Sequence, residues 1–285
     1  MGGEKQVKKL YAVLGDPIGH TMSPVMLNDL FSFYQIDAHY LPFHVKAEDL
    51  EAAVKGLKAI GAGGFNVTIP HKSHIIPFLD GVDELAASIG AVNTVVNEGG
   101  RLIGYNTDGP GFLKGLHAYI PSVAGQRILI IGAGGAARAI YFTLANAKPL
   151  VIDIANRTIE TAAKLIEDCP YNSSSRALSL NEAGKNIGEY DLIIQTTMIG
   201  MSPKMTEQPL NLDNLRKQSL VCDIIYNPLK TQFLYAASAK GARIQNGIDM
   251  FVYQGALAFE KWTGIFPDVQ RMGNNVLVQL GGNPC

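Results

Sequence analysis

The sequence has few of the features that mark secreted, membrane-bound or nucleic-acid-binding proteins. It contains only three cysteines, Cys169, Cys222 and Cys285, which are widely spaced and lack the Cys or His spacing of a metal site. Charged residues make up 17% of the chain, the formal net charge is −1, and no run of like charge occurs. This balance argues against nucleic-acid and membrane-surface partners. Scattered cysteines suit a reducing compartment, so a cytoplasmic location is predicted.

Long apolar stretches are missing too. Residues 1–9 are polar and charged where a secretory signal needs an apolar core, and no apolar run is long enough to span a bilayer. His71 and His74 are three residues apart, but no cysteine or carboxylate completes a ligand set, so no metal is predicted. At 285 residues the chain is long enough for two ordinary domains, and we expect two.

The most informative segment is an apolar run followed by a glycine turn and a helical pattern. The turn, Gly132-Ala133-Gly134-Gly135-Ala136-Ala137, fits the G-x-G-x-x-G/A spacing. Gly132 permits a sharp turn, Gly134 lets the backbone approach a pyrophosphate, and Ala137 keeps the helix close to the strand. A second strand, 150–154, follows at βαβ distance. The segment predicts a dinucleotide site; the alternative is a glycine turn needed only for packing.

The residues after that second strand bear on the choice of cofactor. An acidic residue there binds the ribose 2′-OH of NAD, whereas a nearby arginine accommodates the 2′-phosphate of NADP. Asp153 has the sequence offset of such an acid but lies inside the strand, and Asn156 and Arg157 follow it. NADP is therefore favoured, although Arg157 could be an ordinary surface arginine. Further along, Met198 and Met201 follow another strand and either pack against the nicotinamide or cover the core.

Strands and helices alternate along most of the chain, which predicts an α/β fold. Strands are expected at 10–14, 38–45, 65–69, 91–96 and 101–105, then at 127–131, 150–154, 192–196, 220–225 and 243–245. Helices are expected at 24–34, 48–60, 82–89, 110–119, 159–167, 231–239 and 248–262, with one more after Pro267. The strands of the second half form a doubly wound half-sheet.

Polar side chains follow several of these strands, at the edge where ligands bind in open α/β sheets. Ser23-Pro24 supplies a helix N-cap and a proline at the first helical position, a role compatible with ligand binding. Lys72 directly follows a buried strand, where its amine can transfer a proton. Asp108 either caps the next helix or joins Asn106 and Thr107 in binding a polyhydroxylated ligand.

Six motifs, in order, resemble those of the shikimate dehydrogenase family over nearly the whole chain. They are GDPIGHTMSP at 15–24, NVTIPHK at 66–72, AVNT at 91–94, NTDG at 106–109, the glycine turn with NRT at 156–158, and GIDMFVYQ at 247–254. The resemblance implies an α/β protein with an N-terminal substrate domain at 1–109 and a Rossmann-like NADP domain at 110–247. It also implies C-terminal helices at 248–285 that return to the substrate domain.

The resemblance further implies a reaction, the NADPH-dependent reversible reduction of 3-dehydroshikimate to shikimate in aromatic amino-acid biosynthesis. Lys72 and Asp108 match the catalytic pair, in which Lys72 donates the proton during reduction and Asp108 orients substrate and lysine. The family's substrate-binding positions match Thr21, Ser23, Thr68, Lys72, Asn93, Asp108, Tyr226 and Gln254. Its cofactor positions match Gly132, Ala133, Gly134, Gly135, Ala136, Asn156, Arg157, Thr158, Ile224 and Gly247.

Two positions depart from the family pattern. Thr21 stands where serine is usual, and its methyl group could alter the fit of the substrate carboxylate. The alternative function is therefore a quinate/shikimate dehydrogenase with broader substrate and cofactor use. Leu27-Asn28 stands where a histidine and an asparagine are usual, so the departure is at Leu27, and it is expected to be structural. A ligand-sensing relative without catalysis is a third hypothesis, against which the Lys72/Asp108 pair argues.

The protein is predicted to be a monomer or homodimer acting on a small molecule, with no nucleic-acid or membrane partner.

Overall fold

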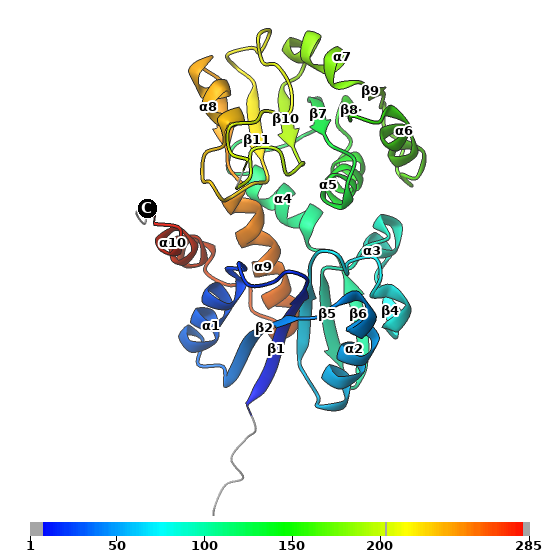
Figure 1. Ribbon diagram of the computed structural model, residues 1–285, viewed down its shortest axis with the longest axis vertical. Coiled ribbons are helices and arrows are strands. Elements are labelled where there is room, and N and C mark those ends of the chain that lie inside the picture. Colours follow the sequence, from blue (N-terminus) through cyan, green and yellow to red (C-terminus); the bar gives the residue numbers. More distant parts are fainter. Residues whose placement is uncertain (1–7, 203, 282–285) are drawn as a thin grey trace, which may run out of the picture. The chain divides into compact units, whose positions relative to one another are not determined.

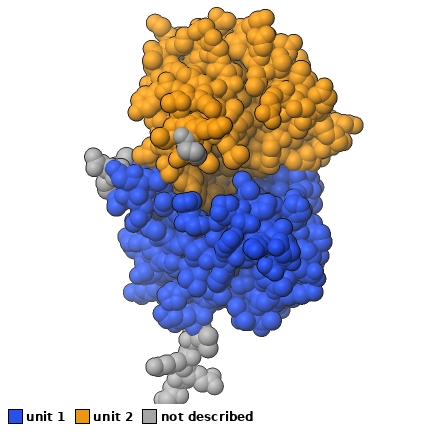
Figure 2. Space-filling model, viewed as in Figure 1, with its two compact units in different colours: residues 1–107, 255–285 blue, residues 108–254 orange. Residues whose placement is uncertain are grey.

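The computed structural model describes residues 8–202 and 204–281 (Figure 1). The chain divides into two compact units, residues 1–107 with 255–285 (unit 1) and residues 108–254 (unit 2), coloured separately in Figure 2. Residues 1–7, most of the polar N-terminal segment, and Cys285 lie outside the described residues. The change from unit 2 back to unit 1 falls within helix α9 (Ile248–Thr263).

Unit 1 is built on a six-stranded mixed sheet with the order β2-β1-β3-β5-β6-β4 (Figure 1). β1 runs parallel to β2 and β3, and β5 is antiparallel to both β3 and β6. The carboxyl ends of β1, β3 and β6 therefore lie at the same edge as the start of β5. The elements are β1 (Lys9–Gly15), α1 (Ser23–Phe33), β2 (Ala38–His44), η1 (Ala47–Asp49), α2 (Leu50–Ala59), β3 (Gly64–Val67), η2 (Ile76–Phe78), β4 (Gly81–Val82), α3 (Glu84–Ile89), β5 (Thr94–Glu98), β6 (Arg101–Tyr105), the C-terminal part of α9, and α10 (Val269–Gln279).

Residues from the C-terminal helices complete the core of unit 1. The Trp262 ring, on α9, lies 4.9 Å from the Tyr11 ring, and its indole nitrogen donates a hydrogen bond of 3.0 Å to the Val95 carbonyl. A side chain at Gly64 would overlap this indole, so the close approach requires glycine. The predicted return of the C-terminal helices to the substrate-domain sheet is confirmed.

Unit 2 is built on a six-stranded parallel sheet with the order β12-β11-β10-β7-β8-β9. The chain adds β8 and β9 on one side of β7, then crosses to add β10, β11 and β12 on the other. The loop after β7 therefore lies at the topological switch point, where open α/β sheets bind ligands. The elements are α4 (Asp108–Leu116), β7 (Arg127–Ile131), α5 (Gly135–Asn146), β8 (Val151–Ala155), α6 (Ile159–Glu167), β9 (Ala177–Leu178), α7 (Leu180–Lys185), η3 (Ile187–Glu189), β10 (Leu192–Gln195), β11 (Leu220–Asp223), α8 (Gln232–Ala239), β12 (Arg243–Gln245) and the first part of α9.

The central strands of unit 2 are buried on both faces. Residues 128–131 of β7 and 193–194 of β10 are completely inaccessible to solvent, which explains their unbroken apolar runs. Ala137 on α5 is also inaccessible, as expected of a small residue that brings helix and strand close together. The predicted fold class, two α/β parts of which the second is Rossmann-like, is confirmed. Strand β9 was not predicted, because two residues are too few to show a period.

Three predicted helix starts are wrong. The helix expected from Val82 begins at Glu84, because Gly81–Val82 form the short strand β4 and Asp83 is the N-cap. Met22 occupies the N-cap position of α1 and makes no side-chain capping bond, while Ser23 is already helical. The Thr21 hydroxyl accepts a hydrogen bond of 3.3 Å from the Ser23 amide. Helix α4 begins at Asp108 rather than near Pro110. Asp108 therefore lies in the first turn, where a carboxylate interacts favourably with the helix dipole, and not at the preceding cap position.

Burial raises the pKa of the Asp223 carboxyl to about 6, although hydrogen bonds from the Ile225 amide and the Thr231 hydroxyl act in the opposite direction. The folded state thus binds this proton more tightly than the unfolded state, whose aspartates titrate near pH ~4. The stability penalty of the ionised group is fully present above pH 6 and is relieved as the pH falls from 6 to 4.

We therefore predict that Asp223→Asn loses this pH dependence. Between pH 7.5 and pH 5, the unfolding free energy of the wild type should rise by about 1.4 kcal/mol relative to the variant. Urea denaturation at both pH values measures the difference. Glu160→Gln, which removes an exposed carboxyl from α6 of the same unit, is the control and should track the wild type. Parallel pH profiles for wild type and Asp223→Asn would contradict the prediction.

Candidate active site

Five of the predicted substrate residues, Thr21, Ser23, Thr68, Lys72 and Asn93, lie in unit 1, and main-chain hydrogen bonds draw their loops together. The Thr68 amide donates to the Leu14 carbonyl at 2.9 Å, which ties the end of β3 to the end of β1. The Val67 amide donates to Asn93 at 2.9 Å, and the Val92 amide donates to Lys72 at 2.7 Å. These residues therefore share the edge of the sheet at which β1, β3 and β6 end.

The hydroxyls of Thr21 and Ser23 lie side by side before and at the start of α1. Thr21 Oγ1 is 3.3 Å from Ser23 Oγ, and Ser23 is 8% exposed. Behind them the Tyr40 phenol is completely buried. Burial raises the pKa of Tyr40 well above its usual value, and a hydrogen bond from Ser23 opposes this increase. The phenol thus stays neutral and acts as both hydrogen-bond donor and acceptor.

A buried polar network continues from Tyr40 beneath the site. Its hydroxyl donates to Asn66 Oδ1 at 2.7 Å, Asn66 Nδ2 donates to Thr94 Oγ1 at 3.0 Å, and Thr94 donates to Asn93 Oδ1 at 3.1 Å. Asn93 also accepts the Thr107 amide at 2.8 Å. Satisfied networks of this kind rigidify a core, so they fix Ser23 and Asn93 relative to each other. Tyr40 and Thr94 were not predicted, because their contacts join distant parts of the sequence.

Leu27, which stands where the family usually has histidine, lies in a structural position, and the neighbouring Asn28 is a structural residue too. Leu27 is 1% exposed and packs in the core of unit 1. The Asn28 side chain accepts from the Tyr40 amide at 2.8 Å and donates to the Tyr40 carbonyl at 2.9 Å. Asn28 therefore anchors α1 to β2 through the same residue that supports Ser23.

The histidines on either side of Lys72 have separate structural partners. His71 is completely buried, with Nε2 2.6 Å from the Val45 carbonyl, while His74 Nδ1 lies 3.0 Å from the Pro70 carbonyl. Within residues 8–202 and 204–281, no group of three or more His, Cys, Asp or Glu side chains is placed to hold a metal ion. Lys72 itself is partly buried.

In unit 2 the glycine turn after β7 has the geometry predicted for a dinucleotide site. Gly132 has a φ of 110°, and a Cβ there would lie 2.6 Å from Thr196 Oγ1. By contrast, a Cβ at Gly134 or Gly135 would meet no heavy atom within 4 Å. The backbone at these two positions is therefore open, directly at the N-terminus of α5, where main-chain N–H groups favour an anion. A pyrophosphate fits this arrangement.

A cavity of about 720 Å³ lies beside this turn and brings together Gly132, Asn156, Arg157 and Thr158. Its volume is in the range of small-molecule sites. Sequence reasoning did not find several other residues of its wall, namely Leu180, Lys204, Glu207 and Pro209. Among residues it did consider, Met198 and Met201 also line the cavity and are 72% and 41% exposed, so they do not cover the core.

Asp153, the candidate ribose acid of an NAD site, is engaged elsewhere. It is completely buried, with its carboxylate 2.7 Å from an Arg176 guanidinium nitrogen and accepting from the Tyr190 hydroxyl at 2.7 Å. Burial, assisted by this carboxylate, raises the pKa of the Tyr190 phenol. Asp153 is therefore a structural residue, and the loop after β8 presents Arg157 to the cavity instead.

The remaining predicted residues of unit 2 gather near the start of α9. The Gly247 amide donates to Ile225 at 3.0 Å, and a side chain at Gly247 would overlap the Ile224 carbonyl. The Tyr226 ring lies 4.8 Å from the Phe251 ring, and Gln254 Nε2 donates to the Phe251 carbonyl at 2.8 Å. Burial raises the pKa of Tyr226, so its hydroxyl stays protonated at neutral pH.

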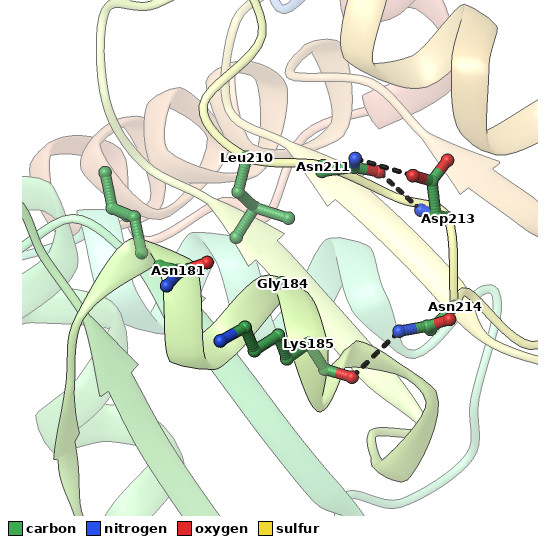
Figure 3. Close-up of a pocket in the computed structure, with 8 residues that line it drawn as sticks. Asn181, Gly184, Lys185, Leu210, Asn211, Asp213 and Asn214 are labelled. Carbon is green, nitrogen blue, oxygen red and sulfur yellow. Dashed lines mark hydrogen bonds between the residues drawn. The ribbon is translucent and has the colours of Figure 1, made fainter.

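A second cavity of unit 2, about 400 Å³, lies between α7 and residues 210–214 (Figure 3). Several of its polar groups bond to one another. Asn211 donates to Asp213 at 2.7 Å and accepts the Asp213 amide, while Asn214 donates to the Lys185 carbonyl at 3.0 Å (Figure 3). These bonds fix the loop to α7, so the residues have a structural role.

Comparisons with known proteins cover almost the whole chain. Residues 13–95 match the shikimate dehydrogenase substrate binding domain, residues 116–226 match shikimate / quinate 5-dehydrogenase, and residues 247–272 match the shikimate 5′-dehydrogenase C-terminal domain. The shikimate dehydrogenase (NADP(+)) of Bacillus anthracis is 56% identical over 97% of this chain and 100% of its own length.

Solved structures agree. A shikimate dehydrogenase in complex with NADP+ superposes with a TM-score of 0.90 at 39% identity, covering 96% of both chains. The enzyme of Thermus thermophilus in complex with NADP(H) and shikimate gives a TM-score of 0.86 at 35% identity, covering 94% of this chain and 98% of the other. No helix of the described part of the chain is long and apolar enough to cross a membrane.

Proposed function

Since the chain belongs to the shikimate dehydrogenase family, we propose that it catalyses the NADPH-dependent, reversible reduction of 3-dehydroshikimate to shikimate in aromatic amino-acid biosynthesis. The full-length similarity to an NADP-dependent shikimate dehydrogenase is the observation that carries this proposal. The cavity beside the glycine turn supports the cofactor, because it combines open glycine backbone with Arg157, while Asp153 of β8 is paired with Arg176.

The nicotinamide cofactor, when bound, supplies the hydride, and residues of this chain position the substrate and handle the proton. Lys72 donates a proton to the ketone oxygen in reduction and accepts it in oxidation. Asp108 orients the substrate and the lysine. Substrate hydroxyls and carboxylate are bound by Thr21, Ser23, Thr68, Asn93, Tyr226 and Gln254. The hydrogen-bonded network under Ser23 and Asn93 supports this role, since rigid donors and acceptors discriminate between polyhydroxylated ligands.

The cofactor is held by the glycine turn and by residues at the carboxyl ends of β8, β11 and β12. These residues are Gly132, Ala133, Gly134, Gly135, Ala136, Asn156, Arg157, Thr158, Ile224 and Gly247. In this proposal residues 1–109 form the substrate domain, residues 110–247 the NADP domain, and residues 248–285 the C-terminal helices. A cytoplasmic monomer or homodimer is also proposed; the free thiols of Cys169 and Cys222 suit a reducing compartment.

Initial rates test the proposal. The initial rate of formation of NADPH or NADH is measured in one buffer for each combination of substrate, shikimate or quinate, with cofactor, NADP or NAD. We expect rapid turnover with shikimate and NADP only. Comparable rates with quinate or NAD would establish the broader quinate/shikimate dehydrogenase and direct attention to Thr21. If no combination is turned over while shikimate still binds, the protein is a ligand-sensing relative and the proposal is wrong.

A further inference from the structure

Two cations from different loops line the cavity beside the glycine turn. Arg157 follows β8, and Lys204 lies in the loop after β10. No other lysine, arginine or histidine occurs in the described wall of this cavity. In the sheet, β8 and β10 are the two neighbours of β7, so the loops that carry these cations flank the loop with the glycine turn.

The sheet geometry sets how far apart the two loops begin. Neighbouring strands are about 4.8 Å apart, so β8 and β10 are separated by roughly 10 Å. Arginine and lysine side chains are each long enough to reach most of that distance, and both side chains line the same cavity. Arg157 makes no ion pair with another residue within the described part of the chain.

Lys204 has only a loose partner. Its ammonium lies 3.9 Å from the Glu207 carboxylate, and the two side chains are 75% and 51% exposed. An exposed contact of this length contributes little to stability. Glu207 also lines the cavity, so this contact keeps the Lys204 side chain at the cavity wall. The contact is too weak to neutralise the charge of the ammonium. A dianionic phosphate is a stronger partner for the ammonium than a single exposed carboxylate.

We propose that Lys204 is a second determinant of cofactor specificity, which binds the 2′-phosphate of NADP together with Arg157. The inference rests on the proposed function, since it assigns a residue to the cofactor of that reaction. Arg157 supplies a planar, directional contact to the phosphate, and Lys204 supplies a point charge from the opposite loop.

Binding of cofactor fragments tests the assignment without turnover. Isothermal titration calorimetry on the full-length protein measures the affinity for 2′,5′-ADP and for 5′-AMP, which lacks the 2′-phosphate. We expect Lys204→Gln to weaken 2′,5′-ADP binding by about 3- to 10-fold, the size of one partly exposed ionic contact, and to leave 5′-AMP binding unchanged. Lys204→Arg should restore most of the loss. Lys217→Gln, an exposed lysine of unit 2 outside this wall, is the matched control.

Three results would overturn the inference. They are unchanged 2′,5′-ADP affinity in Lys204→Gln, equal losses for 2′,5′-ADP and 5′-AMP, and an equal loss in Lys217→Gln. Arg157→Gln, measured beside these variants, separates this inference from the proposed function. A defect in Arg157→Gln with normal binding in Lys204→Gln would remove only Lys204. Wild-type protein that does not distinguish 2′,5′-ADP from 5′-AMP would remove the NADP proposal as well.

Discussion

Lys72→Ala should lower kcat for shikimate oxidation by about 10²–10⁴-fold, the usual contribution of general acid–base catalysis, with a much smaller change in shikimate affinity. The lysine follows β3 at the edge where the other predicted substrate residues of unit 1 meet. Its main-chain carbonyl accepts the Val92 amide, a contact that truncation of the side chain leaves intact. The loss is expected in the chemical step.

Steady-state kinetics and a direct shikimate titration together check this prediction. Lys55→Ala is a suitable control, because Lys55 is an exposed lysine of unit 1 that pairs with Glu51 on the same helix. Its kcat should match the wild type. A Lys72→Ala enzyme with kcat within about threefold of the wild type would exclude Lys72 from proton transfer, since even weak general catalysis exceeds that factor.

Arg157→Gln should raise KM for NADP by about 10- to 100-fold, because charge-assisted contacts between guanidinium and phosphate are among the strongest hydrogen bonds in proteins. KM for NAD should change little, since NAD has no 2′-phosphate. The residue is exposed, lines the cavity beside the glycine turn, and makes no ion pair in the described structure that its removal would break. The expected signature is therefore a reduced preference for NADP over NAD.

The ratio of kcat/KM for the two cofactors measures this preference. Arg101→Gln, at the exposed hairpin of unit 1, removes the same charge far from the cavity in sequence and should leave the ratio unchanged. Equal losses with NADP and NAD in Arg157→Gln would show that the residue shapes the site as a whole. The 2′-phosphate would then have to be bound by other residues.

The glycine turn shows which structural features the local sequence can predict. A few positions encode a buried apolar strand, a residue that must adopt a positive φ, and a helix that begins directly after it. Gly132 has the φ that this pattern requires. The two neighbouring glycines leave open backbone where an anion is expected. These properties depend on steric limits of single residues, so no distant contact was needed to predict them.

Asp153 shows where local reasoning stops. Its sequence offset resembles that of a ribose-binding acid, but Arg176 and Tyr190 neutralise and bury it. Likewise, Ser23-Pro24 predicts a helix cap, yet Ser23 lies in the first turn of α1 and its hydroxyl bonds to Tyr40 on strand β2. A polar side chain uses the partner that tertiary packing places nearest, and the sequence alone does not name that partner.

The sequence by itself thus determined the order and type of most elements, the dinucleotide turn and the family, because periodicity, glycine conformation and motif spacing are local properties. Only the tertiary structure decided which polar groups are engaged in the core and which are presented to a ligand. The Tyr40 network and the positions of Lys204 and Arg157 in one cavity wall arise from strand order. Strand order depends on how whole faces of helices and strands bury their apolar surface, and that is a property of the folded chain.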